Sequence, residues 1–156
     1  MLVKRDILVN MVFGSHLYGT DTPKSDMDYK GVFLPSLEQV YLQKVPHSIS
    51  TSTKKSEHDK NEAEDVDNEI YSLHYFLHLA CEGETVALDM LHAPTKFYIE
   101  STGIWDELVA NRHLFYTRNL KAFVGYARRQ AAKYGVKGSR LAEAKAVVTF
   151  LKAQPK

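Results

Sequence analysis

Two aspartates separated by one residue, Asp26 and Asp28, are the side chains of this 156-residue chain whose type and spacing most directly suggest chemistry. On an extended strand they share one face, with Cα atoms about 6–7 Å apart at a rise of roughly 3.3 Å per residue. Two carboxylates so placed can converge on Mg²⁺ or Mn²⁺ ions, which stand about 3.5–4 Å apart in two-metal sites. Without a cation the negative charges would repel each other. The pair therefore predicts a divalent-metal site.

A Gly-Ser pair, Gly14 and Ser15, follows an apolar run and precedes Asp26 by ten intervening residues. A glycine after a strand lets the backbone approach a phosphate, and the next N–H groups and the serine hydroxyl can donate hydrogen bonds to it. The spacer suffices for a turn or a short helix and a return to the neighbouring strand. Transfer of a nucleotidyl group needs such a phosphate cradle beside carboxylate-bound cations. The combination is far more specific than an isolated Asp-x-Asp.

The elements that must position these residues follow from hydrophobic patterning. Strands are predicted at Ile7–Phe13, Asp26–Leu34 and Val66–Tyr71, and turn residues fill 14–25. Amphipathic spacing predicts helices at 37–42, 72–82, 85–91, 104–110, 117–134 and 139–152, with Ser72 as the N-cap of the second. Residues 43–65 are polar without a pattern, which indicates either a mobile functional loop or a hairpin too polar to recognise.

We expect the chain to have two parts, a core over residues 1–100 and a helical segment over residues 101–156 that packs on it. The apolar face of the last predicted helix needs a partner. This favours a chain truncated relative to a longer relative, with a natural end as the alternative. The sequence contains no internal repeat and no clear interdomain linker.

Composition excludes several classes of protein. With 44% hydrophobic and 25% charged residues, the chain resembles a globular domain rather than a disordered segment. No apolar run approaches the roughly 20 residues of a membrane span, and the N-terminus lacks the pattern of a secretory signal. Cys81 is the single cysteine, so an internal disulfide is excluded and a reducing compartment is favoured. We therefore expect a cytoplasmic protein without a membrane partner, with Cys81 buried as a small apolar side chain.

Charge is unevenly distributed although the net charge is only +1. Residues 112–140 hold eight Lys or Arg and no acid, whereas residues 56–69 hold seven acids and one lysine. A basic patch and an acidic patch on one small domain suit polyphosphate and metal ions respectively. Two solvated faces are the alternative interpretation of the same pattern.

The segment Phe13–Leu34, FGSHLYGTDTPKSDMDYKGVFL, resembles the signature of the DNA polymerase β superfamily of nucleotidyltransferases: an apolar residue, Gly-Ser, a spacer, then Asp-apolar-Asp. In detail it is similar to the branch of predicted nucleotidyltransferases associated with RNA ligases in bacteria and large phages. Residues 69–94, EIYSLHYFLHLACEGETVALDMLHAP, also resemble that branch. One difference lies at Gly83-Glu84-Thr85, where relatives often have Gly-Asn-Pro.

This resemblance implies the minimal nucleotidyltransferase fold of the polymerase β type. That fold is α+β, with a small mixed sheet and flanking helices, and a helical C-terminal segment follows it here. The resemblance also implies that Gly14 and Ser15 hold the triphosphate of an NTP, while Asp26 and Asp28 bind Mg²⁺ or Mn²⁺. These implied roles agree with the chemistry suggested by the residues themselves.

The superfamily also uses a third carboxylate, on a neighbouring strand, to help activate the acceptor hydroxyl. Asp67 and Glu69 are the candidates because they share one face of the predicted strand, and Asp67 is favoured. Further contacts with the NTP are expected from His16, Tyr18, Ser25, Lys30, Lys137, Ser139 and Arg140. The loop residues among them can equally pack the loop, and the basic ones can equally form a solvated surface.

A histidine pair on a predicted helix is a weaker feature. His74 and His78 are four residues apart, a spacing that can bind zinc. No third ligand is apparent beside them in the sequence. A solvated or packed helix face is therefore the favoured interpretation.

Together these features predict a metal-dependent nucleotidyltransferase. It would move an NMP from an NTP, with ATP among the candidates, to an acceptor hydroxyl and release pyrophosphate. The ligase association of the branch favours RNA as the acceptor over a protein side chain or a small molecule. Two alternatives are retained: a catalytically inactive module that binds nucleotide or RNA, and a protein-modifying enzyme of a toxin–antitoxin or phage-defence pair. The nucleobase and the oligomeric state are left open.

Overall fold

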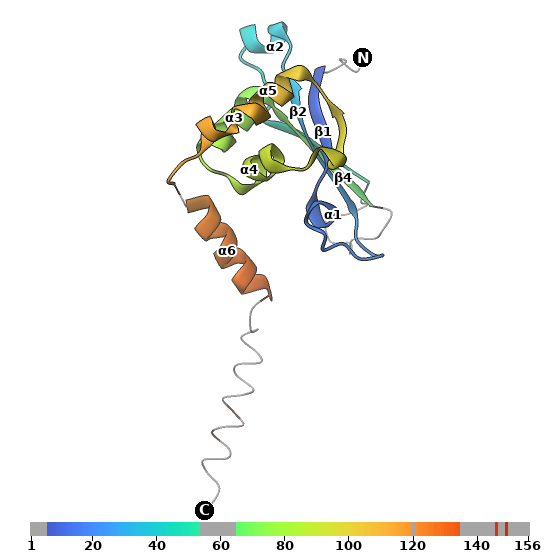
Figure 1. Ribbon diagram of the computed structural model, residues 1–156, viewed down its shortest axis with the longest axis vertical. Coiled ribbons are helices and arrows are strands. Elements are labelled where there is room, and N and C mark those ends of the chain that lie inside the picture. Colours follow the sequence, from blue (N-terminus) through green and yellow to red (C-terminus); the bar gives the residue numbers. More distant parts are fainter. Residues whose placement is uncertain (1–5, 54–64, 120, 135–145, 147–148, 150–156) are drawn as a thin grey trace, which may run out of the picture. The chain divides into compact units, whose positions relative to one another are not determined.

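The computed structural model describes residues 6–53, 65–119, 121–134, 146 and 149 (Figure 1). The strands of this part are β1 (Asp6–Val12), β2 (Met27–Leu34), β3 (Ser48–Ser52), β4 (Val66–Ser72) and β5 (Tyr98–Ser101). Its α-helices are α1 (Gly14–Tyr18), α2 (Leu37–Tyr41), α3 (Leu73–Cys81), α4 (Thr85–His92), α5 (Gly103–Ala110) and α6 (Lys121–Tyr134). Two short 3₁₀ helices are η1 (Thr95–Phe97) and η2 (Arg112–Phe115).

The strands form one mixed sheet in the order β3-β4-β2-β1-β5. Strand β2 runs parallel to β4, and the remaining neighbours are antiparallel. A parallel pair requires a crossover connection, which here contains α2 and β3. Strand β2 therefore lies at the centre of the sheet, and its residues meet those of β4 side by side. The expected α+β fold with a small mixed sheet is confirmed.

Helices α3, α4 and α5 cover the apolar end of one sheet face (Figure 1). Val9 of β1, Val32 of β2 and Tyr71 of β4 are aligned across the strands there and are buried. Phe76 of α3 and Trp105 of α5 belong to the same core, with their ring centroids 5.3 Å apart. Burial of large apolar side chains is the main favourable term in folding. This core holds the strands in place at one end, and the other ends of the same strands carry polar side chains.

The polar stretch at residues 43–65 contains a strand that patterning does not reveal. Strand β3, SISTS, pairs antiparallel with β4, so residues 48–52 form a strand, as the alternative of a hairpin too polar to recognise requires. Its polar composition suits an edge strand, because an edge exposes its outer side to solvent. Residues 54–64 lie outside the described residues. Strand β5, on the opposite edge, is also absent from the sequence predictions because it is only four residues long.

Helix α1 occupies the first part of the segment 14–25, where either a turn or a short helix is expected. Two local expectations need correction. Ser72 precedes α3 but makes no cap bond with its side chain, because its hydroxyl is buried and donates to the carbonyl oxygen of His47 at 3.1 Å. Cys81 is exposed rather than buried, since it lies at the last position of α3 while its neighbour Ala80 occupies the core.

Helix α6 begins at Lys121 rather than at Thr117. Asn119 Oδ1 accepts a hydrogen bond from the backbone N–H of Lys121, the first residue of the helix, at 3.2 Å. The helix carries four Lys or Arg residues and no acid, in agreement with the basic stretch of the sequence. Most of the predicted helix over residues 139–152 lies outside the described residues. Within the described part, no helix has the length and apolarity needed to cross a membrane.

Contacts divide the chain into one compact unit over residues 1–118 and a second over residues 119–156. The first unit extends beyond the expected core boundary at residue 100. The physical reason is that α5 contributes the fully buried Trp105 to the core cluster of the sheet. The first unit therefore contains the complete sheet, its covering helices and the candidate site described next.

Candidate metal and nucleotide site

Three aspartate side chains lie close together at the polar end of one face of the sheet. Asp28 of β2 and Asp67 of β4 are partners in the parallel ladder, and Asp26 directly precedes β2. One carboxylate oxygen of each lies within 4.8 Å of the others, and all three residues are half-buried. Within the described residues, no other group of three or more acidic, His or Cys side chains has this geometry. The predicted convergence of Asp26 and Asp28 is confirmed, and Asp67 joins them.

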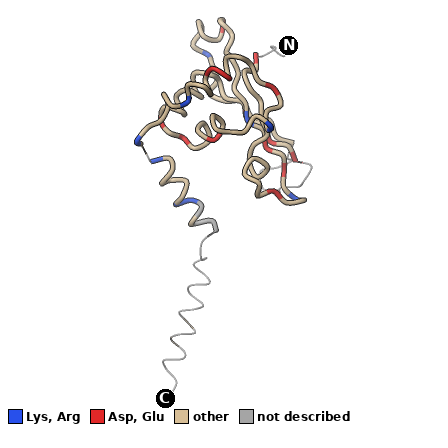
Figure 2. The backbone as a smooth tube through the Cα atoms, in the orientation of Figure 1, with Lys and Arg blue, Asp and Glu red and all other residues tan. Residues whose placement is uncertain are grey.

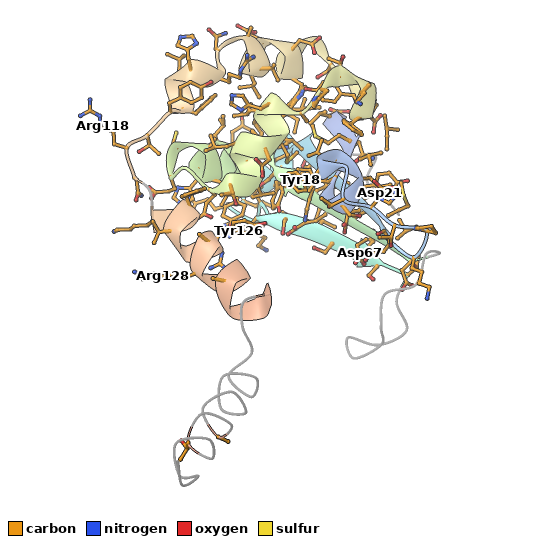
Figure 3. All side chains as sticks on the ribbon, turned by 60° about the horizontal axis from the view of Figure 1, so that its bottom comes forward. Tyr18, Asp21, Asp67, Arg118, Tyr126 and Arg128 are labelled. Atoms are coloured by element: carbon orange, nitrogen blue, oxygen red, sulfur yellow. The ribbon has the colours of Figure 1, made fainter. Side chains whose placement is uncertain are left out.

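The carboxylate cluster lies beside α1 and next to an open depression. Figure 2 shows acidic positions gathered along the strands at the end of the sheet near α1, and Figure 3 labels Asp67 among the strands. A depression of about 260 Å³ adjoins the cluster, lined by Asp28, Lys30, Ser50, Thr51, Ser52, Asp67, Asn68 and Glu69. The site therefore has space for part of a ligand directly beside the carboxylates.

Gly14 makes a close approach to Asp28 that no other residue could make. Its φ of +59° is left-handed, and a Cβ placed on it would lie 1.9 Å from Asp28 Oδ2. The backbone N–H of Phe13 donates to the carbonyl oxygen of Asp28 at 2.8 Å, which fixes the start of α1 beside β2. Glycine adopts this φ without the steric cost of a side chain. The predicted proximity of the Gly-Ser turn to the aspartates is therefore present in the fold.

The donor set fits a hard divalent cation. Mg²⁺ and Mn²⁺ prefer carboxylate oxygens, and Mg²⁺ usually combines one or two carboxylates with phosphate and water ligands. Asp26, Asp28 and Asp67 would hold such an ion. The missing Cβ at Gly14 lets the backbone of the Gly-Ser turn lie directly against the Asp28 carboxylate. Sulfur and nitrogen ligands, which would favour zinc, are absent from this cluster.

The loop residues expected to contact the nucleotide have local partners. Ser15 Oγ and His16 Nδ1 are 3.4 Å apart, and both residues are half-buried. Tyr18, labelled in Figure 3, donates its hydroxyl to Asp89 Oδ2 of α4 at 2.7 Å. Ser25 Oγ accepts a backbone N–H within its own turn at 2.9 Å. The Tyr18–Asp89 bond anchors the loop to α4, whereas the other two contacts are local. Contacts of the loop residues with a nucleotide stay a prediction.

Glu69, the alternative third carboxylate, has different partners from Asp67. Its register partner on β2 is Lys30, one step along the ladder from the aspartate pair. Lys30 Nζ donates to Glu69 Oε2 at 2.6 Å. Tyr71 OH donates to the same oxygen at 2.7 Å, and Ser48 Oγ donates to Oε1 at 3.0 Å. Glu69 is thus held by an ion pair and two hydroxyl groups, while Asp67 joins the aspartate cluster.

The environment of Glu69 changes its ionisation. Burial raises the pKa of Glu69, but hydrogen bonds from Lys30, Tyr71 and Ser48 and the charge of Lys30 outweigh burial and hold the pKa below its ordinary value of 4.5. Burial, followed by the hydrogen bond to Glu69 and its charge, raises the pKa of Tyr71. At neutral pH the carboxylate is therefore ionised and the tyrosine hydroxyl remains a donor.

We expect Glu69 to make the stability of the protein depend on pH in acid. Because its pKa is lower in the folded chain, ionised Glu69 stabilises the fold above about pH 4.5, and this contribution is lost as the pH falls through the folded pKa. Urea unfolding of wild type and Glu69→Gln over that range measures it. The difference in unfolding free energy should narrow as the pH falls, and a constant or widening difference would contradict the assignment.

The remaining predicted residues fall outside the aspartate cluster. Lys137, Ser139 and Arg140 lie outside the described residues. His74 and His78 of α3 are exposed, and they belong to no metal-compatible group among the described side chains. The ring of His47 stacks on that of Tyr75, with centroids 4.3 Å apart and an interplanar angle of 3°.

The sequence profile of RlaP, the RNA repair pathway DNA polymerase beta family, matches residues 3–152. The match includes nearly the whole chain. This protein belongs to the RNA repair pathway DNA polymerase beta family. A relative from Enterobacteria phage T4, named "Uncharacterized 38.9 kDa protein in nrdC-mobD intergenic region", is 45% identical over 150 residues. The aligned region covers 95% of this chain and 44% of the phage protein, so the chain spans less than half the length of that relative.

Membership of this polymerase beta family confirms the superfamily that the residues of Phe13–Leu34 resemble. The carboxylate cluster is the arrangement expected for a nucleotidyltransferase of that superfamily. Sequence reasoning missed two residues of the site, Tyr71 and Ser48, which bind Glu69. Strand alternation was the available signal for Tyr71, since it stands two residues after Glu69. No comparable signal exists for Ser48, because its contact depends on pairing between β3 and β4.

Proposed function

We propose that this polymerase beta family protein is a metal-dependent nucleotidyltransferase that transfers an NMP from an NTP to an acceptor hydroxyl. The observation that carries the proposal is the convergence of Asp26, Asp28 and Asp67 within 4.8 Å, directly beside Gly14. Carboxylates on two adjacent strands and a glycine turn at their side supply the metal and phosphate contacts that such a transfer requires.

The residues of the site have distinct roles in this proposal. Asp26, Asp28 and Asp67 hold the cations, and Gly14 and Ser15 hold the triphosphate. Divalent cations, when bound, neutralise negative charge on the reacting phosphate oxygens. Asp67 accepts the proton of the acceptor hydroxyl. The acceptor oxygen bonds to the α-phosphorus, the bond from that phosphorus to the β-bridging oxygen breaks, and pyrophosphate leaves.

RNA is the acceptor that we favour. The family description refers to an RNA repair pathway, and an RNA end presents a ribose hydroxyl of the required kind. Helix α6 adds four basic residues, Lys121, Arg128, Arg129 and Lys133, without an acid. Basic helices supply the sequence-independent attraction that nucleic acids need. Transfer of label to protein instead of RNA would favour the protein-modifying alternative.

Calorimetric titration of each NTP, with and without Mg²⁺, tests the site without knowledge of the acceptor. Wild type should bind an NTP in a Mg²⁺-dependent manner. The double variant Asp26→Asn/Asp28→Asn should lose the Mg²⁺-dependent binding, because two of the carboxylates that hold the cation are neutralised. Correctly folded wild type that binds no NTP under either condition would contradict the proposal. Glu100→Gln, on the opposite edge strand β5, is the matched control and should bind as wild type does.

A further inference from the structure

The Lys30–Glu69 ion pair lies one ladder step from the proposed metal ligands. In the parallel pairing of β2 and β4, Asp28 faces Asp67, and the next pair on the same face is Lys30 with Glu69. A two-residue step along a strand is about 6.5 Å, within the reach of a lysine side chain. All four residues line the same depression. The ammonium group of Lys30 is therefore close enough to influence the aspartate cluster.

A lysine in this position can compete with a metal ion for the three carboxylates. Three carboxylates within 4.8 Å attract the nearest cation, whether it is a metal ion or an ammonium group. The flexible four-carbon stem of Lys30 allows Nζ to turn towards Asp28, two residues away on the same face of β2. An ammonium group there would engage oxygens that a divalent cation needs.

Glu69 is arranged to retain the ammonium group. Its Oε2 accepts from Lys30 Nζ at 2.6 Å and from Tyr71 OH at 2.7 Å, and its Oε1 accepts from Ser48 Oγ at 3.0 Å. Tyr71 is only 6% exposed, so its hydroxyl is anchored by the core. The Tyr71 ring centroid also lies 5.7 Å from Nζ, at a distance that favours a cation–π contact. Glu69 and Tyr71 thus draw Lys30 to the side away from the aspartates.

We propose that Glu69 is a positioning residue that holds Lys30 away from Asp28 and Asp67 and thereby raises the affinity of the site for divalent cations. The inference rests on the proposed function, since it concerns the same metal site. Glu69 does not bind the cation and acts through Lys30. This role explains why β4 carries two acids on one face although only Asp67 joins the cluster.

Titration of the full chain with Mn²⁺ alone, without nucleotide, tests this role by electron paramagnetic resonance of the unbound ion. Glu69→Gln keeps the size of the side chain but loses the charge that retains Lys30, and should weaken Mn²⁺ affinity about two- to fivefold. Adding Lys30→Met should restore the affinity to at least the wild-type value, because the competitor is removed. Restoration by a second substitution also excludes a general loss of structure as the cause.

A variant that changes no charge separates positioning from simple loss of charge. Tyr71→Phe removes one bond that holds Glu69 and should weaken Mn²⁺ affinity about two- to threefold. Unchanged affinity in Tyr71→Phe assigns the effect to charge alone and overturns the positioning role. Unchanged affinity in Glu69→Gln, or a double variant as weak as Glu69→Gln, overturns it as well. Wild type that binds no Mn²⁺ contradicts the proposed function together with this inference.

Discussion

Asp67→Asn is expected to lower nucleotidyl transfer by about 10²–10⁴-fold, the usual contribution of a general base. Asp67 is the carboxylate of the cluster that β4 contributes, on the side where the depression opens towards β3. An acceptor hydroxyl entering there would meet this oxygen, and Asp28, which lines the same depression, stands with Asp26 at the start of β2. An amide cannot accept the proton, although it still offers an oxygen ligand. We therefore expect Mg²⁺-dependent NTP binding to weaken by less than about tenfold.

The assay for Asp67 is transfer of label from an α-labelled NTP to an RNA pool, with NTP binding measured in parallel by calorimetry. Glu100→Gln, an exposed carboxylate on β5 at the other edge of the sheet, is the matched control and should keep both activities. Equal losses of binding and transfer in Asp67→Asn would indicate that Asp67 acts as a metal ligand only. Transfer at the wild-type rate would remove Asp67 from the mechanism.

Gly14→Ala is expected to disrupt the site and to lower the unfolding free energy by about 2–5 kcal/mol. A left-handed conformation costs an L-residue about 1–2 kcal/mol, and insertion of a methyl group into a packed position costs about 1–3 kcal/mol. The alanine Cβ would lie 1.9 Å from Asp28 Oδ2, so either α1 or the Asp28 carboxylate must move. We expect the affinity for Mn²⁺ to fall by at least about tenfold, because the carboxylate is displaced.

Gly19→Ala provides the matched control for Gly14→Ala. Gly19 has a similar φ of +67°, but a Cβ there would meet no atom within 4 Å. The Gly19→Ala variant should therefore lower the unfolding free energy by only the conformational cost, about 1–2 kcal/mol. Its affinity for Mn²⁺ should stay that of wild type. Urea unfolding and Mn²⁺ titration of both variants make the comparison. If the two variants behave alike, the close approach of Gly14 to Asp28 has no functional consequence.

Local sequence predicts most of the regular elements in the described part of the chain. The apolar run before Gly14 and the segment Asp26–Leu34 form β1 and β2 close to their predicted bounds. Strand alternation and turn residues are properties of a few neighbouring amino acids, so they can be recognised without knowledge of the fold. The same holds for α3, α4 and α5, whose apolar faces repeat at helical spacing.

Strands β3 and β5 could not be predicted in this way. Strand β3 contains four hydroxyl residues and one isoleucine, so no apolar face marks it. It is ordered through its ladder with β4, which provides hydrogen bonds regardless of side-chain type. Strand β5 has only four residues, and it pairs with β1, which lies at the opposite end of the first unit in the sequence. Both strands depend on long-range pairing.

By itself the sequence determines that a glycine turn and two aspartates stand on neighbouring elements, because a short spacer joins them. Only the tertiary structure distinguishes Asp67 from Glu69, since both lie on one face of β4 and differ in the β2 residue that each meets. Asp67 meets Asp28, and Glu69 meets Lys30, 39 positions away in the chain. A register shift of two residues would change these partners. The register is set where Val32 and Tyr71 pack together in the core, and no local pattern contains that information.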